Sequence, residues 1–180
     1  MSCGEGGRIR DVLAIIGVAI EPTAGAEEDA EPEGPVGPLP APGFTEMGWR
    51  NEPDGLSAFL ARVTEDYAPE SILVTENGAS YSDGPDDTGR VDDTRRIEYL
   101  DAHIEAVMSA RRAGVPVDGY FVWSFLDNLE WVQGFSQRFG LVWVDPDTGI
   151  RIPKASYYWY RDRIAAPTDP ATNPAPRRPR

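Results

Sequence analysis

Apolar residues recur at helical spacing between residue 53 and residue 67. Pro53 suits the first turn of a helix, where no backbone N–H donor is needed. The positions that form one face of that helix are Leu56, Phe59, Leu60, Val63 and Tyr67. This spacing predicts an amphipathic helix that buries one face against a core.

Two short apolar runs follow, separated by a longer helical pattern. The runs at 71–75 (Ser-Ile-Leu-Val-Thr) and 120–125 (Tyr-Phe-Val-Trp-Ser-Phe) are continuous, which is typical of strands covered on both faces. Between them, Asp92 or Asp93 can cap a long helix that ends before Pro116. The buried positions predicted for this helix are Ile97, Leu100, Ile104, Val107 and Met108. Strand, helix and strand form a βαβ unit, which predicts two parallel strands.

The C-terminal part of the chain reads as a hairpin and a helix. Residues 141–144 and 150–152 flank the turn-forming residues Asp-Pro-Asp-Thr-Gly, and residues 154–165 are predicted to form the final helix. The ends of the chain differ in composition. Residues 21–43 are rich in Pro, Gly, Glu and Ala, and the tail at 165–180 is rich in Pro and Arg, so we predict disorder in both.

The composition narrows the function classes. The chain has 180 residues and a formal net charge of −13, from 30 acidic and 17 basic side chains. A surface this acidic disfavours nucleic acid as a partner. Cys3 is the single cysteine, so the chain has no intrachain disulfide. No group of His, Cys, Asp and Glu has metal-site spacing and no Gly-rich loop precedes a helix, so we predict neither a metal nor a cofactor.

One apolar run, residues 12–20, lies near the N-terminus. It is much shorter than the roughly 20 residues that cross a bilayer. Arg8 and Arg10 precede it in the manner of a secretory signal, but Asp11 and Glu21 bracket it too closely for a good one. We therefore expect no membrane partner, and a cytoplasmic location rather than secretion.

Polar and aromatic residues cluster where the two predicted parallel strands end. The first strand runs into Thr75-Glu76-Asn77-Gly78, so Glu76 is expected directly after it, and the second runs into the segment from Trp123 to Trp131. In parallel α/β folds the C-terminal strand ends form the active face. Aromatic platforms beside carboxylates suit sugars, which combine apolar faces with hydroxyl rims. Taken alone, Glu76 could still be a surface strand-end residue, and both tryptophans could fill the core.

Four motifs favour the functional interpretation of these residues, because together and in this order they resemble the motifs of family-one glycoside hydrolases. They span residues 44–164 and consist of Thr45-Glu46-Met47-Gly48-Trp49, Thr75-Glu76-Asn77-Gly78, the segment Trp123–Trp131, and Arg138-Phe139-Gly140-Leu141-Val142 with Pro153-Lys154-Ala155-Ser156. Residues 1–43 show no such resemblance, and we expect this segment to lack regular structure. The resemblance implies an α/β fold that is the C-terminal portion of a TIM (β/α)8 barrel, namely its last two strands and their helices. A complete barrel needs about 250 residues.

The resemblance also implies a role for each site residue. Glu76 would be the nucleophile that attacks the anomeric carbon, and Glu130 would accept hydrogen bonds from two sugar hydroxyls. Trp123 would stack on the apolar face of the sugar. Trp131 would donate its indole N–H to a hydroxyl, and Phe139 would line the sugar subsite.

A retaining mechanism needs a second carboxyl group, the acid/base. In the family it lies in an Asn-Glu-Pro motif three barrel strands before the nucleophile, so we expect it to be absent from this chain. Asn51-Glu52-Pro53 reproduces the three letters, but no apolar strand precedes it and its segment matches a different family region. We therefore predict that Glu52 is not catalytic, and that it lies near the N-terminal face of the sheet.

The implied function is that of a retaining β-glucosidase acting on small β-glycosides or cello-oligosaccharides. We expect a truncated chain that lacks the acid/base and is poorly soluble or inactive alone. The alternative is a sugar-binding or vestigial product that keeps part of a glucose subsite without doing chemistry. A third reading is a fragment that works with a separate chain supplying the earlier strands. Glycone preference and oligomeric state stay open.

Overall fold

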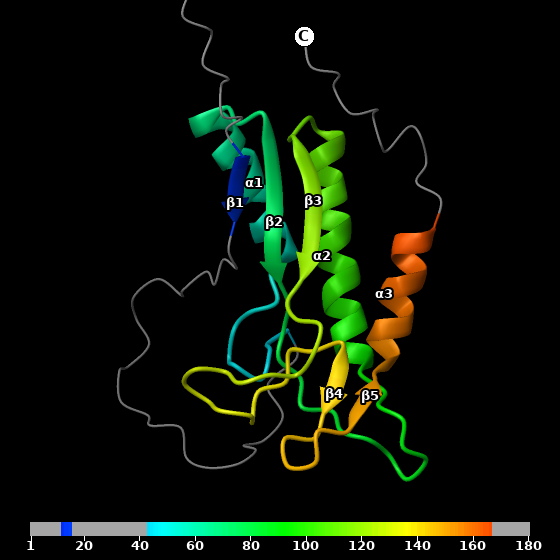
Figure 1. The fold of residues 1–180 in the computed structure, drawn as a ribbon. Helices are drawn as coiled ribbons and strands as arrows, with labels where there is room; N and C mark the ends of the chain where they lie inside the picture. The colour runs from blue at the N-terminus through cyan, green and yellow to red at the C-terminus, as the bar shows by residue number, and fades with distance from the viewer. Residues whose placement is uncertain (1–11, 16–42, 167–180) are drawn as a thin grey trace, which may run out of the picture.

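The computed structural model describes residues 12–15 and 43–166 (Figure 1). Its helices are α1 (Pro53–Tyr67), α2 (Thr94–Arg112) and α3 (Ala155–Ala165). Its strands are β1 (Val12–Ile15), β2 (Ser71–Asn77), β3 (Val117–Val122), β4 (Val142–Val144) and β5 (Arg151–Pro153). The disorder predicted at residues 21–42 and 167–180 lies outside the described residues. Within them, no helix is long and apolar enough to cross a membrane.

The main sheet has one strand more than the sequence predicts. β2 and β3 pair in parallel as expected, but β1 pairs in parallel with the other edge of β2, so the order is β1-β2-β3. The prediction that residues 1–43 lack regular structure is therefore wrong for Val12–Ile15. The apolar run at the N-terminus does suit a strand, but its partner is distant in sequence, and the run itself carries no sign of that partner.

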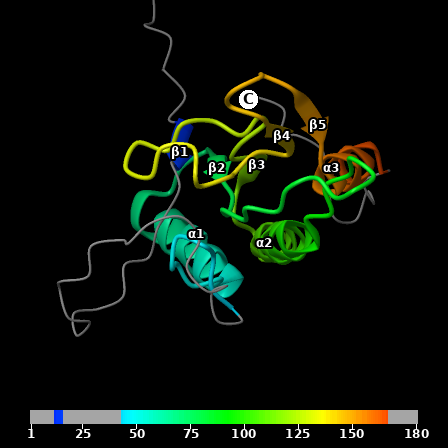
Figure 2. The same ribbon diagram turned by 90° about the horizontal axis from the view of Figure 1, so that it is seen from below.

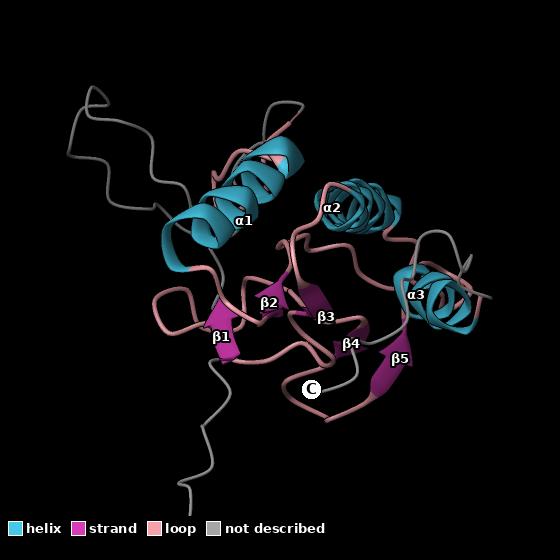
Figure 3. Ribbon diagram, turned by 90° about the horizontal axis from the view of Figure 1, so that it is seen from above, coloured by secondary structure: helices cyan, strands magenta, loops and turns pink. Residues whose placement is uncertain are grey.

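Helices α1 and α2 cover one face of this sheet (Figures 2 and 3). Their apolar faces meet the strands in a core built from Leu56, Leu60, Val63, Ile72, Val74, Val107, Ala110, Val115 and Val117. None of the described helices lies on the opposite face, and Phe121 of β3 is 55% exposed. The apolar runs predicted strands covered on both faces, so the described residues supply only one of the two covering layers.

Helix α2 turns a different face to the core from the one predicted. Of the predicted stripe, Leu100 and Val107 are buried, but the rest is half-buried: Ile97, Ile104 and Met108. Arg96 and His103 are buried instead. Apolar periodicity misses both because their burial depends on hydrogen bonds. The Nδ1 atom of His103 lies 2.8 Å from the carbonyl oxygen of Tyr99, and the two rings stack with centroids 3.9 Å apart.

The C-terminal elements follow the prediction closely. β4 and β5 form an antiparallel hairpin with Trp143 opposite Ile152, and α3 follows at once. β3, in contrast, ends three residues earlier than its apolar run. The reason is a change of partner: the N–H of Ser124 donates to the carbonyl oxygen of Phe139 at 3.1 Å, which draws the chain away from β2.

The segment before α1 lies at the same end of the sheet as the loop after β2. The N–H of Glu46 donates to the carbonyl oxygen of Ser80 at 3.2 Å, and the cyan segment lies beside the tip of β2 in Figure 1. Glu52 directly precedes α1, so it lies at the C-terminal ends of the strands, and the prediction of the opposite face is wrong. A helix that leads into a parallel strand runs back along the sheet, and therefore begins where the strands end. Glu52 pairs with Arg50 at 2.9 Å, and its side chain is 41% exposed.

Candidate active site

The ends of β2 and β3 are held together through their backbones. The N–H of Trp123 donates to the carbonyl oxygen of Asn77 at 3.0 Å. A Cβ atom added to Gly78 would lie 1.8 Å from the carbonyl oxygen of Trp123, so only glycine permits this approach. Glu76 and Trp123, predicted to act on the same sugar, therefore stand on neighbouring strand ends.

Glu76 lies within β2 rather than directly after it, since the strand continues to Asn77. The pairing with β3 is irregular here. From Val74 to Asn77 β2 advances three residues, whereas their partners on β3, Tyr120 and Val122, are two residues apart. One extra residue on a strand is a β-bulge, a feature that can redirect a side chain. The half-buried Glu76 falls inside it.

A third segment, around Phe139, runs beside the strand ends. The N–H of Leu141 donates to the carbonyl oxygen of Ser124 at 3.0 Å, next to the Ser124–Phe139 bond. Phe139 is 6% exposed, and its ring centroid lies 6.4 Å from that of Trp49, which is 43% exposed. Our sequence reasoning gave Trp49 no site role, although it closes the first of the four motifs. The structure adds it to the aromatic set at this end of the sheet.

Glu130 and Trp131 lie on the long loop between β3 and β4. The backbone N–H groups of Glu130 and Gly134 each donate to the other's carbonyl oxygen at 2.8 Å, which closes a tight turn. Glu130 is half-buried, but Trp131 at the outside of the turn is 95% exposed. The described residues thus bring Glu76, Trp123 and Phe139 together, and leave Trp131 pointing into solvent.

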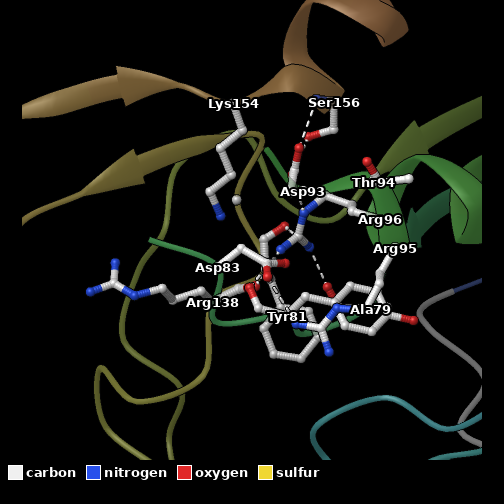
Figure 4. A network of polar contacts seen from close by, with 12 residues as sticks. Ala79, Tyr81, Asp83, Asp93, Thr94, Arg95, Arg96, Arg138, Lys154 and Ser156 are labelled. Carbon is white, nitrogen blue, oxygen red and sulfur yellow. Dashed lines mark hydrogen bonds and ion pairs between the residues drawn. The ribbon is translucent and has the colours of Figure 1, made fainter. Parts of the chain in front are cut away.

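Arg96 ties the loops of the site together (Figure 4). Its guanidinium is 1% exposed and pairs with the buried carboxylate of Asp93 at 2.9 Å. It also donates to four carbonyl oxygens in the loops that carry the strand ends, those of Ala79, Tyr81, Arg138 and Phe139. Asp93 is the N-cap residue of α2, as predicted, but its carboxylate makes no capping bond and accepts instead from the N–H and hydroxyl of Ser156. Sequence reasoning missed this network, since each partner lies on a different element.

Asp127 forms a second buried centre behind Phe139. Its carboxylate accepts from the N–H of Gly140 at 2.8 Å, from Arg138 at 3.0 Å and from the ammonium of Lys154 at 2.9 Å. A Cβ on Gly140 would lie 2.1 Å from the N atom of Asp127. These contacts fix the loop after β3 against the segment that carries Phe139.

Lys154 makes this centre sensitive to pH. Burial, helped by the charge of Arg96 and opposed by Asp127, lowers the pKa of the Lys154 ammonium to about 8. The unfolded chain keeps its proton up to the ordinary value of 10.5, so between these values unfolding takes up a proton and stability rises with pH. We expect the urea midpoint to rise from pH 8 to pH 9.5.

The matched control is Lys154→Arg, which keeps the charge but does not titrate in this range. Lys154 is the only lysine in the sequence, so no second lysine contributes. The rise should disappear in this variant. An equal rise in the variant would show that another group causes it.

A scan against family models matches the chain to "Glycosyl hydrolase family 1" over residues 22–168. The chain belongs to glycosyl hydrolase family 1. The match begins upstream of residue 44, where the first of the four motifs starts. It confirms the resemblance on which the sequence reasoning rested.

Relatives of this family member include β-glucosidases and a 1,4-β-D-glucan glucohydrolase. β-Glucosidase A of Thermotoga maritima is 51% identical over 120 residues, which cover 67% of this chain and 27% of that protein. A 1,4-β-D-glucan glucohydrolase of Thermotoga neapolitana is likewise 51% identical over 120 residues. The solved structure of the T. maritima family 1 β-glucosidase in complex with isofagomine lactam superimposes with a TM-score of 0.67 at 48% identity, over 71% of this chain and 28% of that one. The chain thus spans little more than a quarter of the length of these relatives.

Family 1 membership implies a TIM barrel, of which this chain covers a part. The described residues form a small α/β unit with a three-stranded parallel sheet, not a closed barrel. In a barrel the catalytic groups stand at the C-terminal strand ends. Glu76, Trp123 and the loops held by Arg96 all lie at that end.

Proposed function

We propose that this family 1 glycoside hydrolase chain supplies the nucleophile and part of the glucose subsite of a retaining β-glucosidase. The observation that carries the proposal is the position of Glu76, which is one residue before the end of β2 and is joined through Asn77 and Gly78 to Trp123. Family 1 membership supports glycoside chemistry at this strand end, and the T. maritima relative has been solved in complex with isofagomine lactam.

In the proposed reaction Glu76 attacks the anomeric carbon. A bond forms between a carboxylate oxygen and that carbon, while the bond to the aglycone oxygen breaks and the leaving oxygen takes a proton from the acid/base. Water then attacks the anomeric carbon and gives a proton to the deprotonated acid/base, while the bond to Glu76 breaks and frees its carboxylate. Trp123 would hold the apolar face of the sugar, Glu130 and Trp131 its hydroxyls, and Phe139 would close the subsite. We propose that the acid/base comes from outside residues 43–166, because no apolar strand precedes Glu52 and its segment resembles a different region of the family.

The first step can be tested without an acid/base. Dinitrophenolate leaves without a proton, and fluorine at C2 slows the hydrolysis of the glycosyl-enzyme because it destabilises the oxocarbenium-like transition state. We expect 2,4-dinitrophenyl 2-deoxy-2-fluoro-β-glucoside to add one fluoroglucosyl group to the purified chain. Intact mass spectrometry measures the adduct, and peptide mapping should place it on Glu76.

Glu76→Gln is the matched variant, since the amide keeps the size of the side chain but is not a nucleophile. It should acquire no adduct. An unlabelled wild-type chain that still binds glucose in calorimetry would favour the alternative function, a sugar-binding product without chemistry. Labelling at a residue other than Glu76 would refute the assignment of the nucleophile.

A further inference from the structure

The side chain of Asn77 is held between the hydroxyls of two tyrosines, the buried Tyr99 and the half-buried Tyr120. The hydroxyl of Tyr120 donates to its Oδ1 at 2.6 Å, and its Nδ2 donates to the hydroxyl of Tyr99 at 3.4 Å. Tyr120 belongs to β3 and Tyr99 to α2, so the amide bridges the sheet and the helical layer. Burial raises the pKa of Tyr99 to about 12 and also raises the pKa of Tyr120. Both hydroxyls therefore stay protonated at ordinary pH.

These contacts show which face of the sheet Asn77 occupies. Its partner Tyr99 lies on a helix that packs against the sheet, so Asn77 faces the helices. Val74 faces them too, since it is 1% exposed within the core formed with α1 and α2. In a regular strand, residues three apart point to opposite faces. The bulge is the reason that these two share one face.

The extra residue in the bulge also decides to which face of the sheet Glu76 points. Without the extra residue, Glu76 would share the face of Ile72 and Val74 and enter the apolar layer beneath α1 and α2. With it, both residues inside the bulge, Thr75 and Glu76, are turned away from the helices. That direction is the uncovered face of the sheet, which becomes the interior when the barrel closes.

We propose that Asn77 is a positioning residue, locked by Tyr120 and Tyr99, whose anchorage on the helical side holds the bulge and thereby aims Glu76 at the sugar. This inference rests on the proposed function for its catalytic meaning. Asn77 itself does not touch the reacting atoms. Its contribution is to the orientation of the carboxylate before attack.

The experiment compares three variants with the wild-type chain by fluoroglucoside labelling over a range of reagent concentrations. Tyr120→Phe removes one hydroxyl and should lower the saturating labelling rate about tenfold. Asn77→Ala removes both anchors and should lower it about a hundredfold, the scale expected for a small misplacement of a reacting group. The reagent concentration that gives half the maximal rate should stay unchanged, because sugar binding is intact.

Tyr160→Phe is the matched control. Its hydroxyl donates to the backbone carbonyl of Tyr120 at 3.4 Å without contacting Asn77. It should label at the wild-type rate, with a urea midpoint close to that of Tyr120→Phe. Equal losses of rate in Tyr120→Phe and Tyr160→Phe would overturn the proposal, because they would point to general loosening.

A second readout separates this inference from the proposed function. Carbodiimide coupling to an amine, mapped at Glu76, reports how open its carboxylate is, whether or not the chain can be glycosylated. Asn77→Ala should slow coupling at Glu76, because a relaxed strand turns the carboxylate toward the helices. If the wild-type chain is not labelled but Asn77→Ala slows carbodiimide coupling at Glu76, the proposed glycosidase function is rejected and the positioning role of Asn77 is supported. If coupling at Glu76 is unchanged in both Asn77→Ala and Tyr120→Phe, the positioning role of Asn77 is rejected.

Discussion

Replacing Arg96 by methionine is expected to lower the free energy of unfolding by about 3–5 kcal/mol, the cost of breaking a buried ion pair from one side. The variant leaves the buried carboxylate of Asp93 without its cation, and it removes the guanidinium donor from four loop carbonyls, of which those of Arg138 and Phe139 keep a backbone N–H donor. Small domains are stable by only about 5–15 kcal/mol, so this loss is a large fraction of the total stability. Urea unfolding followed by far-UV circular dichroism measures the change.

Two further variants make this test specific. Arg62→Met removes a surface pair with Asp66, whose side chains are 71% and 39% exposed, and should cost at most about 1 kcal/mol. Adding Asp93→Asn to Arg96→Met removes the stranded charge and should restore part of the lost stability. If Arg96→Met unfolds at the same urea concentration as Arg62→Met, the network does not hold the loops.

Gly78→Ala is expected to destabilise the chain by about 3 kcal/mol, at the upper end of the range for overpacking. The added methyl would lie 1.8 Å from the carbonyl oxygen and 2.8 Å from the carbonyl carbon of Trp123. Both are backbone atoms, which cannot rotate away like a side chain. The strand ends must separate, so labelling of Glu76 should fall as well.

Gly84→Ala is the control for this substitution. Gly84 lies in the same loop, and a Cβ there meets nothing within 4 Å. It should unfold and label like the wild type. A Gly78→Ala variant with wild-type stability would mean that the two strand ends are less tightly joined than the structure indicates.

Periodicity predicted the local elements of this chain well. α1, the β2–α2–β3 unit and the hairpin depend on contacts between residues that are near in sequence or follow a simple alternation. The misses depend on contacts between distant segments. β1 needs β2 as its partner, and the burial of Arg96 needs carbonyls from two loops that are far apart in the chain. A charged side chain in a helical pattern is otherwise interpreted as exposed.

The candidate site divides in the same way. Glu76 and Trp123 could be picked out because the residue types, their order and their place after apolar runs all agree. The bulge could not be found, since an extra residue is visible only when the register against β3 is known. The expected place of Glu52 is wrong for a simpler reason. The helix that follows Glu52 begins at the C-terminal ends of the strands and runs toward their N-terminal ends, which is the reverse of the direction expected.

The pairing of β1 with β2 has a consequence for assembly. With β3 on one side and β1 on the other, β2 has no free backbone edge. In a closed barrel that second side belongs to the preceding barrel strand. A polypeptide that carries such a strand can join this sheet there only by strand exchange, in which it displaces Val12–Ile15. The four-residue β1 therefore covers a backbone edge of β2 that would otherwise be open to pairing with another chain.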